Sequence, residues 1–309
     1  MPLRIIRRLL LRFRGSRVFN YVNVSTVQEI GGNRVVLPLM GRVGFDNLSS
    51  AEPWLDTWLT RAFTHRSGVF LDVGVNVGQT LLKVKTLRPC IQYVGFEPNP
   101  VCFHYTQTLI ERNGFEKCTL FPVGLSNRTA LMPFFMRNEH DVSASVVEGF
   151  RPLSESPQKM HVAVFEGDSV LDQLEVGEIG VMKIDVEGGE LEVVEGLVRT
   201  IRRDRPLIFC EILPAFFDSY QKHRFRQPRQ ERLIAQLREM DYVMYRLLED
   251  TTALPLADIE AHDDVRLTNY LLVPAEDPFR SLLDQGEPFR AAQATEDASE
   301  IGRPRTPRS

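Results

Sequence analysis

The sequence predicts an α/β fold in which a mostly parallel β-sheet carries helices on both faces. From Val69 onward, apolar strand-like segments alternate with helix-like segments, and a glycine-containing turn joins the first strand to the first helix. Such alternation implies crossover connections, which make successive strands parallel. The last two strands are separated by about twenty polar and acidic residues without a helix. We therefore expect a seven-stranded sheet that ends in an antiparallel hairpin.

Each element follows from a local pattern. Residues 20–39 alternate around Gly31-Gly32-Asn33, which predicts a β-hairpin, and apolar residues on neighbouring turns predict a helix over 54–63. Apolar runs bounded by glycine, proline and polar residues predict the strands 69–73, 91–96, 118–123, 179–184, 206–212, 242–248 and 268–273. Helical spacing predicts the helices 79–87, 99–112, 189–202 and 228–240.

Length and composition indicate one large folded domain. The chain has 309 residues, of which 43% are hydrophobic, enough to bury a substantial core. We assign a basic segment to 1–19, a single domain to 20–280 and a disordered tail to 281–309, where the chain turns polar. Within the domain, the hairpin and first helix occupy 20–66 and the α/β core occupies 67–280. The formal net charge of -4 gives no reason to expect nucleic-acid binding.

The first 28 residues contain six arginines and no acid. Apolar residues recur there at helical spacing, so residues 1–17 are a candidate peripheral membrane contact; the alternative is a helix that packs on the protein and exposes its arginines. Arginines interrupt every apolar stretch, which argues against a secretory signal. The four cysteines show no zinc-site spacing, so we expect a reducing, cytoplasmic setting and no metal site.

A nucleotide-binding turn is the most informative local feature. The strand ending at Asp72 leads through Gly74 and Gly78 into a helix that begins near Gln79. Glycines allow a close approach of backbone to ligand, and a helix N-terminus offers free N–H groups. Glu97 ends the next strand, where a carboxylate accepts hydrogen bonds from ribose hydroxyls. Together these residues predict an adenosine-bearing ligand.

Asp72 favours S-adenosylmethionine over a dinucleotide. Its carboxylate would repel a pyrophosphate but attract a sulfonium or an amine. The turn is also Gly-x-x-x-Gly rather than the Gly-x-Gly-x-x-Gly of dinucleotide folds. An NAD-dependent oxidoreductase would need a pyrophosphate-compatible turn, which this sequence lacks.

Acidic residues at later strand ends are the candidate catalytic groups. Asp185 ends the fourth strand, Glu187 lies in the following turn and Glu211 ends the fifth strand. Crowded carboxylates raise each other's pKa, so one can act as a base. We expect Asp185 beside the cofactor amine or the acceptor, and Glu187 and Glu211 on the acceptor's hydroxyls. Two alternatives stay open: Glu211 pairs with Lys183, or the carboxylates bind Mg²⁺, although no ligand spacing requires a metal.

Six segments in this order resemble the FkbM-family methyltransferases. They are Asp-Val-Gly-Val-Asn-Val-Gly-Gln at 72–79, Gly-Phe-Glu-Pro-Asn at 95–99, Pro-Val-Gly-Leu-Ser-Asn at 122–127, Leu-Asp at 171–172, Met-Lys-Ile-Asp-Val-Glu-Gly-Gly-Glu at 182–190 and Phe-Cys-Glu-Ile at 209–212. The resemblance implies a Rossmann-like class I methyltransferase fold and S-adenosylmethionine-dependent O-methylation of sugars, glycans or natural products. It also implies roles for single residues: Asp72, Gly74, Asn76 and Gly78 at the methionine end, Glu97 at the ribose, and Gly124, Leu125 and Ser126 beside the adenine.

Two functional hypotheses remain. The first is an O-methyltransferase that acts on a hydroxylated small molecule or glycan. The alternative is a catalytically inactive, methyltransferase-like protein that binds S-adenosylmethionine and serves as a partner of other proteins. The intact Asp72, Gly74, Gly78 and Glu97 favour catalysis. A homo-oligomer is a candidate assembly.

Overall fold

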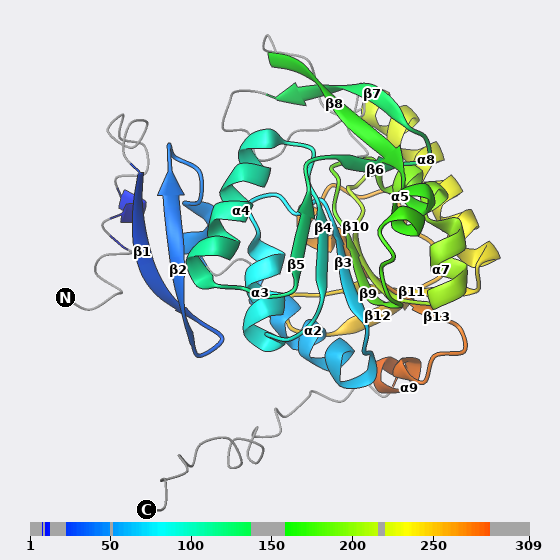
Figure 1. Cartoon of the computed structure of the whole chain (residues 1–309). Coiled ribbons are helices and arrows are strands. Elements are labelled where there is room, and N and C mark those ends of the chain that lie inside the picture. Colours follow the sequence, from blue (N-terminus) through cyan, green and yellow to red (C-terminus); the bar gives the residue numbers. More distant parts are fainter. Residues whose placement is uncertain are drawn as a thin grey trace, which may run out of the picture.

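An eight-stranded sheet forms the centre of the computed structural model, which describes residues 8, 10–12, 23–49, 52–136, 158–215 and 220–284 (Figure 1). The strand order is β12-β11-β13-β10-β9-β3-β4-β5. The strands are β3 (Val69–Val73), β4 (Tyr93–Phe96), β5 (Cys118–Phe121), β9 (Ile179–Ile184), β10 (Leu207–Glu211), β11 (Tyr242–Leu247), β12 (Ala253–Leu256) and β13 (Asn269–Pro274).

The parallel core and its antiparallel end confirm the predicted architecture. Strands β5, β4, β3, β9 and β10 are parallel neighbours, and β13 runs antiparallel to both β10 and β11. The prediction of seven strands is wrong by one, because β12 pairs with β11 at the sheet edge. We expected only loop there, and Pro255 obscures the strand. An edge strand tolerates proline, since one side of its backbone has no partner.

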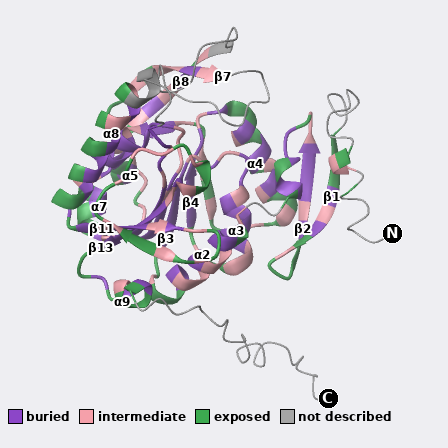
Figure 2. Ribbon diagram, turned by 180° about the vertical axis from the view of Figure 1, so that it is seen from behind, coloured by how far each residue is buried: buried purple, intermediate pink, exposed green. Residues whose placement is uncertain are grey.

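Helices cover both faces of this sheet. One face is covered by α2 (Pro53–His65), α3 (Gln79–Leu87), α4 (Pro100–Asn113) and α9 (Phe279–Asp284). The other is covered by α5 (Gly167–Gln173), α6 (Glu190–Gly196), α7 (Val198–Asp204) and α8 (Tyr220–Glu239). Buried residues lie along the strands and the inner sides of the helices, and exposed residues face outward (Figure 2). The sheet therefore separates two hydrophobic cores.

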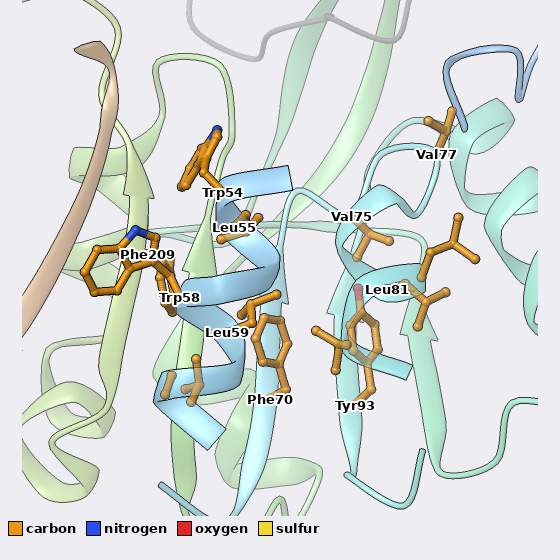
Figure 3. Packing of buried hydrophobic residues seen from close by; sticks show 14 of the residues in the cluster. Trp54, Leu55, Trp58, Leu59, Phe70, Val75, Val77, Leu81, Tyr93 and Phe209 are labelled. Carbon is orange, nitrogen blue, oxygen red and sulfur yellow. The ribbon is translucent and has the colours of Figure 1, made fainter. Parts of the chain in front are cut away.

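Helix α2 anchors one of these cores. Trp54, Leu55, Trp58 and Leu59 project from its inner side toward the sheet (Figure 3). Below them, the rings of Phe70 and Tyr93 stack at 5.8 Å between centroids. Full burial of one large apolar side chain contributes about 2 kcal/mol, so this layer is a major source of stability. Side chains two residues apart share a face of a strand. Asp72 lies two residues after Phe70, and Lys183 lies two residues after Val181, so both point toward this same side of the sheet.

The N-terminal hairpin docks on α4. Strands β1 (Asn23–Ile30) and β2 (Asn33–Met40) pair antiparallel around Gly31 and Gly32, both with positive φ, as the sequence predicted. The Asn113 side chain donates to the Val36 carbonyl at 2.8 Å and accepts from its N–H at 2.7 Å. One asparagine therefore satisfies both backbone groups of an edge residue and fixes the hairpin to the core.

A second, three-stranded sheet was not predicted. It consists of β6 (Gly124–Ser126), β7 (Ala130–Met136) and β8 (Gln158–Glu166) in the order β6-β8-β7. Strand β8 is parallel to β6 and antiparallel to β7. Phe134, Val162 and Val164 form its buried cluster. The pairing joins segments far apart in sequence, and β6 is only three residues long, so local patterns carry little sign of it.

Most predicted boundaries agree with the structure to within two residues, and three predictions differ by more. The predicted helix 189–202 is two helices, which are separated at Leu197. The residue before this break, Gly196, packs so closely against β6 that a Cβ there would lie 1.9 Å from the Ser126 carbonyl oxygen. Helix α8 begins eight residues before the predicted start at Pro228, which lies inside it. Helix α9 extends to Asp284, past the predicted domain end at 280, because Phe279 and Leu283 are buried. The predicted basic segment 1–19, apart from residues 8 and 10–12, and residues 285–309 of the predicted tail lie outside the described residues.

Gly74 sits where the ends of three strands meet. Its N–H donates to the Phe96 carbonyl at 3.0 Å, and the Asp185 N–H donates to the Val73 carbonyl at 2.9 Å. A Cβ on Gly74 would lie 1.8 Å from the Asp185 carbonyl oxygen, and its φ is +94°. Only glycine fits this crossing.

Substitution of Gly74 should therefore lower the free energy of unfolding by far more than the backbone strain of a positive φ alone would. Gly114, which ends α4, also has positive φ, but nothing lies within 4 Å of its Cβ position. We expect Gly114→Ala to lower the free energy of unfolding by about 1 kcal/mol and Gly74→Ala by more than about 3 kcal/mol. Urea denaturation of both variants measures the difference. Equal losses of stability in the two variants would contradict the close contact between Gly74 and the Asp185 carbonyl.

Candidate active site

A pocket opens at the carboxyl ends of β3, β4, β9 and β10. Open α/β sheets bind their ligands at this edge. The lining residues come from the strand ends, the turns that follow them and the second sheet: Val73, Gly74, Asn76, Phe96, Glu97, Pro98, Asn99, Gly124, Leu125, Phe134, Val164, Asp185, Val186, Glu187 and Glu211.

Glu97 is held in place by two backbone donors. Its Oε2 accepts from the Asn76 N–H and its Oε1 from the Asn99 N–H, each at 2.7 Å. Burial raises the pKa of Glu97 to about 7, although these two hydrogen bonds favour the charged form. Each carboxylate oxygen has a second lone pair. Glu97 is thus a fixed acceptor that can bind hydroxyl groups in the pocket.

Five of the eight predicted cofactor residues line the pocket, namely Gly74, Asn76, Glu97, Gly124 and Leu125. Asp72 does not. Its side chain is fully buried on the α2 side of the sheet, where the Tyr93 hydroxyl donates to Oδ2. Oδ1 has no hydrogen-bond partner in the described part of the chain, and burial raises the pKa of Asp72 to about 6. The structure therefore places Asp72 beneath the pocket, near Lys183, and outside the pocket lining.

Gly78 and Ser126 also lie outside the pocket lining. Gly78 precedes α3 with φ +74°, and a Cβ there would meet Thr106 and Leu109 of α4 at 3.1 Å. The Ser126 backbone lies against Gly196 instead. Gly78 thus allows close packing between the turn before α3 and helix α4.

The three predicted catalytic residues converge at one end of the pocket. Asp185, Glu187 and Glu211 all line it. Lys183 Nζ lies 2.6 Å from Asp185 Oδ2, so Lys183 pairs with Asp185 and not with Glu211. Glu211 hydrogen-bonds Asp185 and accepts from the Thr268 hydroxyl at 3.1 Å.

Burial and neighbouring charges shift the pKa values of Asp185 and Glu211 in opposite directions. Burial and the neighbouring Asp185 carboxylate raise the pKa of Glu211 well above its usual range. Burial also opposes ionisation of Asp185, but the adjacent Lys183 ammonium outweighs it and holds the pKa of Asp185 below its ordinary value. At neutral pH Asp185 is therefore ionised, and Glu211 carries a proton that it donates to Asp185.

The turn that carries Glu187 is braced from two directions. Glu187 and Gly188 both have positive φ. The Gly188 N–H donates to Glu190 Oε1, and its carbonyl accepts from Arg229 of α8, each at 2.9 Å. Arg229 also pairs with Glu192 of α6. Glu190, in the first turn of α6, thus helps to hold the turn that carries Glu187.

Sequence reasoning missed the wall formed by the second sheet. Phe134 of β7 and Val164 of β8 line the pocket opposite the main sheet. The apolar run over 162–165 was a usable strand signal, but nothing local indicated where that strand would pack. The described residues contain no group of three or more His, Cys, Asp or Glu side chains arranged to hold a metal ion. No helix among them has both the length and the apolar character needed to span a bilayer.

Comparison with known proteins identifies a methyltransferase domain. Residues 72–244 match the model of the methyltransferase FkbM domain. The hexuronic acid methyltransferase AglP of Haloferax volcanii is 29% identical over 136 residues, which cover 43% of this chain and 52% of that protein. The match thus spans about half the length of this curated relative.

The solved structures to which this chain shows a likeness are less similar in sequence. The methyltransferase FkbM from Methylobacillus flagellatus KT is 16% identical with a TM-score of 0.43, covering 67% of this chain and 43% of that one. The SAH-bound methyltransferase PaMTH1 of Podospora anserina is 14% identical with a TM-score of 0.40, covering 72% of this chain and 78% of that one.

The protonated Glu211 should make stability fall at alkaline pH. Its pKa rises from about 4.3 in the unfolded chain to about 9 in the folded protein. The folded state holds the extra proton between these values, so the stabilisation is present at low pH and is lost as the pH rises through the folded pKa. We expect Glu211→Gln to lose less stability than the wild type between about pH 7 and about pH 9.5 in urea denaturation.

Glu276→Gln is the control for this measurement. The Glu276 carboxyl is exposed, and its hydrogen bond with Arg205 lowers its pKa to about 2, outside the window. The stability of the Glu276→Gln variant should therefore decline with pH as that of the wild type does. An equally steep decline in Glu211→Gln would contradict a protonated Glu211.

Proposed function

The chain belongs to the FkbM methyltransferase domain family, and from that membership we propose that it transfers a methyl group from S-adenosylmethionine to a hydroxyl group of a sugar, glycan or natural-product acceptor. The family match covers more than half of the 309 residues and includes every residue proposed below for cofactor or acceptor binding. The one observation that carries the proposal is the pocket itself, which joins a hydroxyl-binding carboxylate at Glu97 to a carboxylate cluster around Asp185.

The pocket residues fit S-adenosylmethionine. Glu97 is positioned to accept from ribose hydroxyls, since its two backbone donors leave a lone pair on each oxygen. Leu125 and Phe134 supply apolar surface for the adenine, beside Gly124. Gly74 and Asn76 border the end assigned to the methionine portion. When bound, the cofactor supplies an electrophilic methyl group on a sulfonium.

Carboxyl groups of the chain can bind, orient and deprotonate the acceptor. Glu187 and Asp185 accept hydrogen bonds from its hydroxyls, which orients one oxygen for attack. That oxygen becomes strongly acidic only as its new bond to carbon forms, so a weakly basic carboxylate suffices to take the proton. Asp185 is ionised and suits this role, while Lys183 stabilises its charge. The products would be the O-methylated acceptor, S-adenosylhomocysteine as the leaving group, and a proton that passes from Asp185 to solvent.

The sugar class of the acceptor is supported by one comparison. The matched Haloferax volcanii protein is named for methylation of a hexuronic acid, at 29% identity over about half of its length. Several hydroxyl-binding carboxylates at one end of the pocket agree with a polyhydroxylated acceptor.

Glu97→Gln should weaken cofactor binding. The substitution replaces one charged acceptor with an amide whose NH₂ faces a backbone donor. We expect the affinity for S-adenosylhomocysteine to fall roughly tenfold, about 1.4 kcal/mol, measured by isothermal titration calorimetry. Glu111→Gln on the exposed side of α4 is the matched control and should bind as the wild type does. Unchanged affinity in Glu97→Gln would remove Glu97 from the cofactor site.

Asp185→Asn should slow transfer without weakening cofactor binding. Loss of the proton acceptor should reduce turnover about a hundredfold or more, while calorimetry with S-adenosylhomocysteine stays within about twofold of the wild type. Asp172→Asn on α5, half exposed, is the control. In Asp185→Asn, Lys183 loses the carboxylate with which it pairs, and this can destabilise the fold. The double variant Lys183→Gln/Asp185→Asn removes that unpaired cation, so that a loss of turnover through misfolding can be separated from the loss of the proton acceptor. Full turnover in a folded Asp185→Asn protein would exclude Asp185 from the reaction.

A further inference from the structure

We propose that Asp72 is a positioning residue for the methyl transfer: held by Tyr93, it attracts the ammonium group of Lys183 in competition with Asp185, and so keeps the Asp185 carboxylate able to take a proton. Asp72 lies outside the pocket lining, so this role rests on the proposed function and acts through residues that the reaction uses. Its side chain is fully buried, and the proposed reaction otherwise leaves this acid without a part.

Asp72 and Lys183 lie side by side on neighbouring strands. The register pairs Asp72 of β3 with Lys183 of β9, and both side chains point to the α2 side of the sheet. Neighbouring strands are about 4.8 Å apart, so the two side chains leave the sheet next to each other. Asp72 is 0% exposed, and the Lys183 side chain is 12% exposed. Water therefore screens the attraction between the two charges only weakly.

The Lys183 ammonium group acts on two carboxylates. Its Nζ lies 2.6 Å from Asp185 Oδ2, and it also attracts the carboxylate of Asp72. Burial raises the pKa of Asp72 to about 6, so Asp72 is ionised at neutral pH. Its charge pulls on the flexible lysine side chain and also repels the Asp185 carboxylate. Asp185 thus stays ionised but binds a proton more readily than it would if Asp72 carried no charge.

Tyr93 fixes the Asp72 carboxylate from the next strand. Its hydroxyl donates to Asp72 Oδ2, and its fully buried ring stacks on Phe70 with 5.8 Å between centroids (Figure 3). Gly95 of β4 lies opposite Asp72 in the register, and a Cβ there would lie only 3.0 Å from Cε1 of the Tyr93 ring. The missing side chain of Gly95 thus leaves the room through which Tyr93 reaches Asp72.

Packing alone does not call for a charge at this position. The core on the α2 side of the sheet is built of large apolar residues, among them Trp58, Leu59 and Phe70. A buried carboxylate costs free energy unless its partners compensate, and replacement of buried charges by apolar residues often leaves a protein as stable or more so. The carboxylate of Asp72 is therefore explained by its effect on Lys183, which the pairing with Asp185 links to the pocket.

The test is an NMR titration of Glu211 in the full-length protein, which needs no acceptor. Glu211 hydrogen-bonds Asp185, and Lys183, Glu187 and the Thr268 hydroxyl also face it. Protein labelled with carbon-13 at the glutamate carboxyl carbons reports the titration, and Glu211→Gln assigns the signal. In the wild type we expect the midpoint at about pH 9.

Asp72→Asn should move this midpoint down by about half a pH unit or more. The variant keeps an acceptor for the Tyr93 hydroxyl but removes the charge. The Lys183 ammonium is then attracted more completely to Asp185, where it also stabilises the ionised form of Glu211.

The same substitution in a Lys183→Gln background should shift the midpoint much less, because Asp72 acts through the lysine. Asp172→Asn on α5, half exposed, is the control and should leave the midpoint unchanged. Asp72→Ser, which is smaller and keeps a hydroxyl for Tyr93, is the second variant if Asp72→Asn does not fold.

A second readout applies to any acceptor that the wild type methylates. Asp72→Asn should lower kcat about threefold, since Asp185 becomes a weaker base, and leave the KM for S-adenosylmethionine unchanged. A midpoint that stays or rises in Asp72→Asn, an equal shift in the Lys183→Gln background, or an unchanged kcat overturns the inference. Failure of the proposed function is distinct, because it shows as failure to bind S-adenosylhomocysteine, which the NMR titration does not involve.

Discussion

The contact between two backbone turns, at Gly74 and at Asp185, is the constraint on which the site depends. The missing Cβ of Gly74 lets the Asp185 carbonyl approach to a distance that no other residue allows. Through this contact the turn that carries Asn76 and the turn that carries Glu187 form the floor of one pocket. Glu97 then joins the first turn to the end of β4 through the Asn76 N–H. The residues proposed to bind cofactor and acceptor are thus placed relative to one another by backbone contacts, and flexible side chains contribute little to this placement.

A second constraint is the balance of charge beneath that floor. Lys183 is surrounded by carboxyl groups, and its pairing with Asp185 decides which of them is ionised. Removing one partner of such a buried pair leaves an uncompensated charge, which is far more costly than the pair itself. The same arrangement that keeps Asp185 charged keeps Glu211 protonated. The electrostatic character of the acceptor end therefore follows from residues on the face of the sheet beneath α2.

The sequence was sufficient to predict most of the fold and part of the site. Alternating elements predicted the parallel core, and acidic residues at strand ends predicted Glu97, Asp185, Glu187 and Glu211, because the carboxyl ends of parallel strands share one edge. Asp72 was predicted by the same reasoning, but its side chain points to the α2 side of β3 and does not line the pocket. Gly78 and Ser126 also lie outside the lining; Gly78 packs against α4, and the Ser126 backbone lies against Gly196. Phe134 and Val164 could not be predicted, because their place in the pocket depends on the non-local pairing of β6, β7 and β8.

A crystal structure with S-adenosylhomocysteine tests most directly whether this pocket binds the cofactor, because each part of that molecule has an assigned place in it. The ribose should lie on Glu97, the adenine between Leu125 and Phe134, and the sulfur should face Asp185, with Asp72 out of contact. A nucleoside bound in the reverse direction, or outside this pocket, would contradict the account.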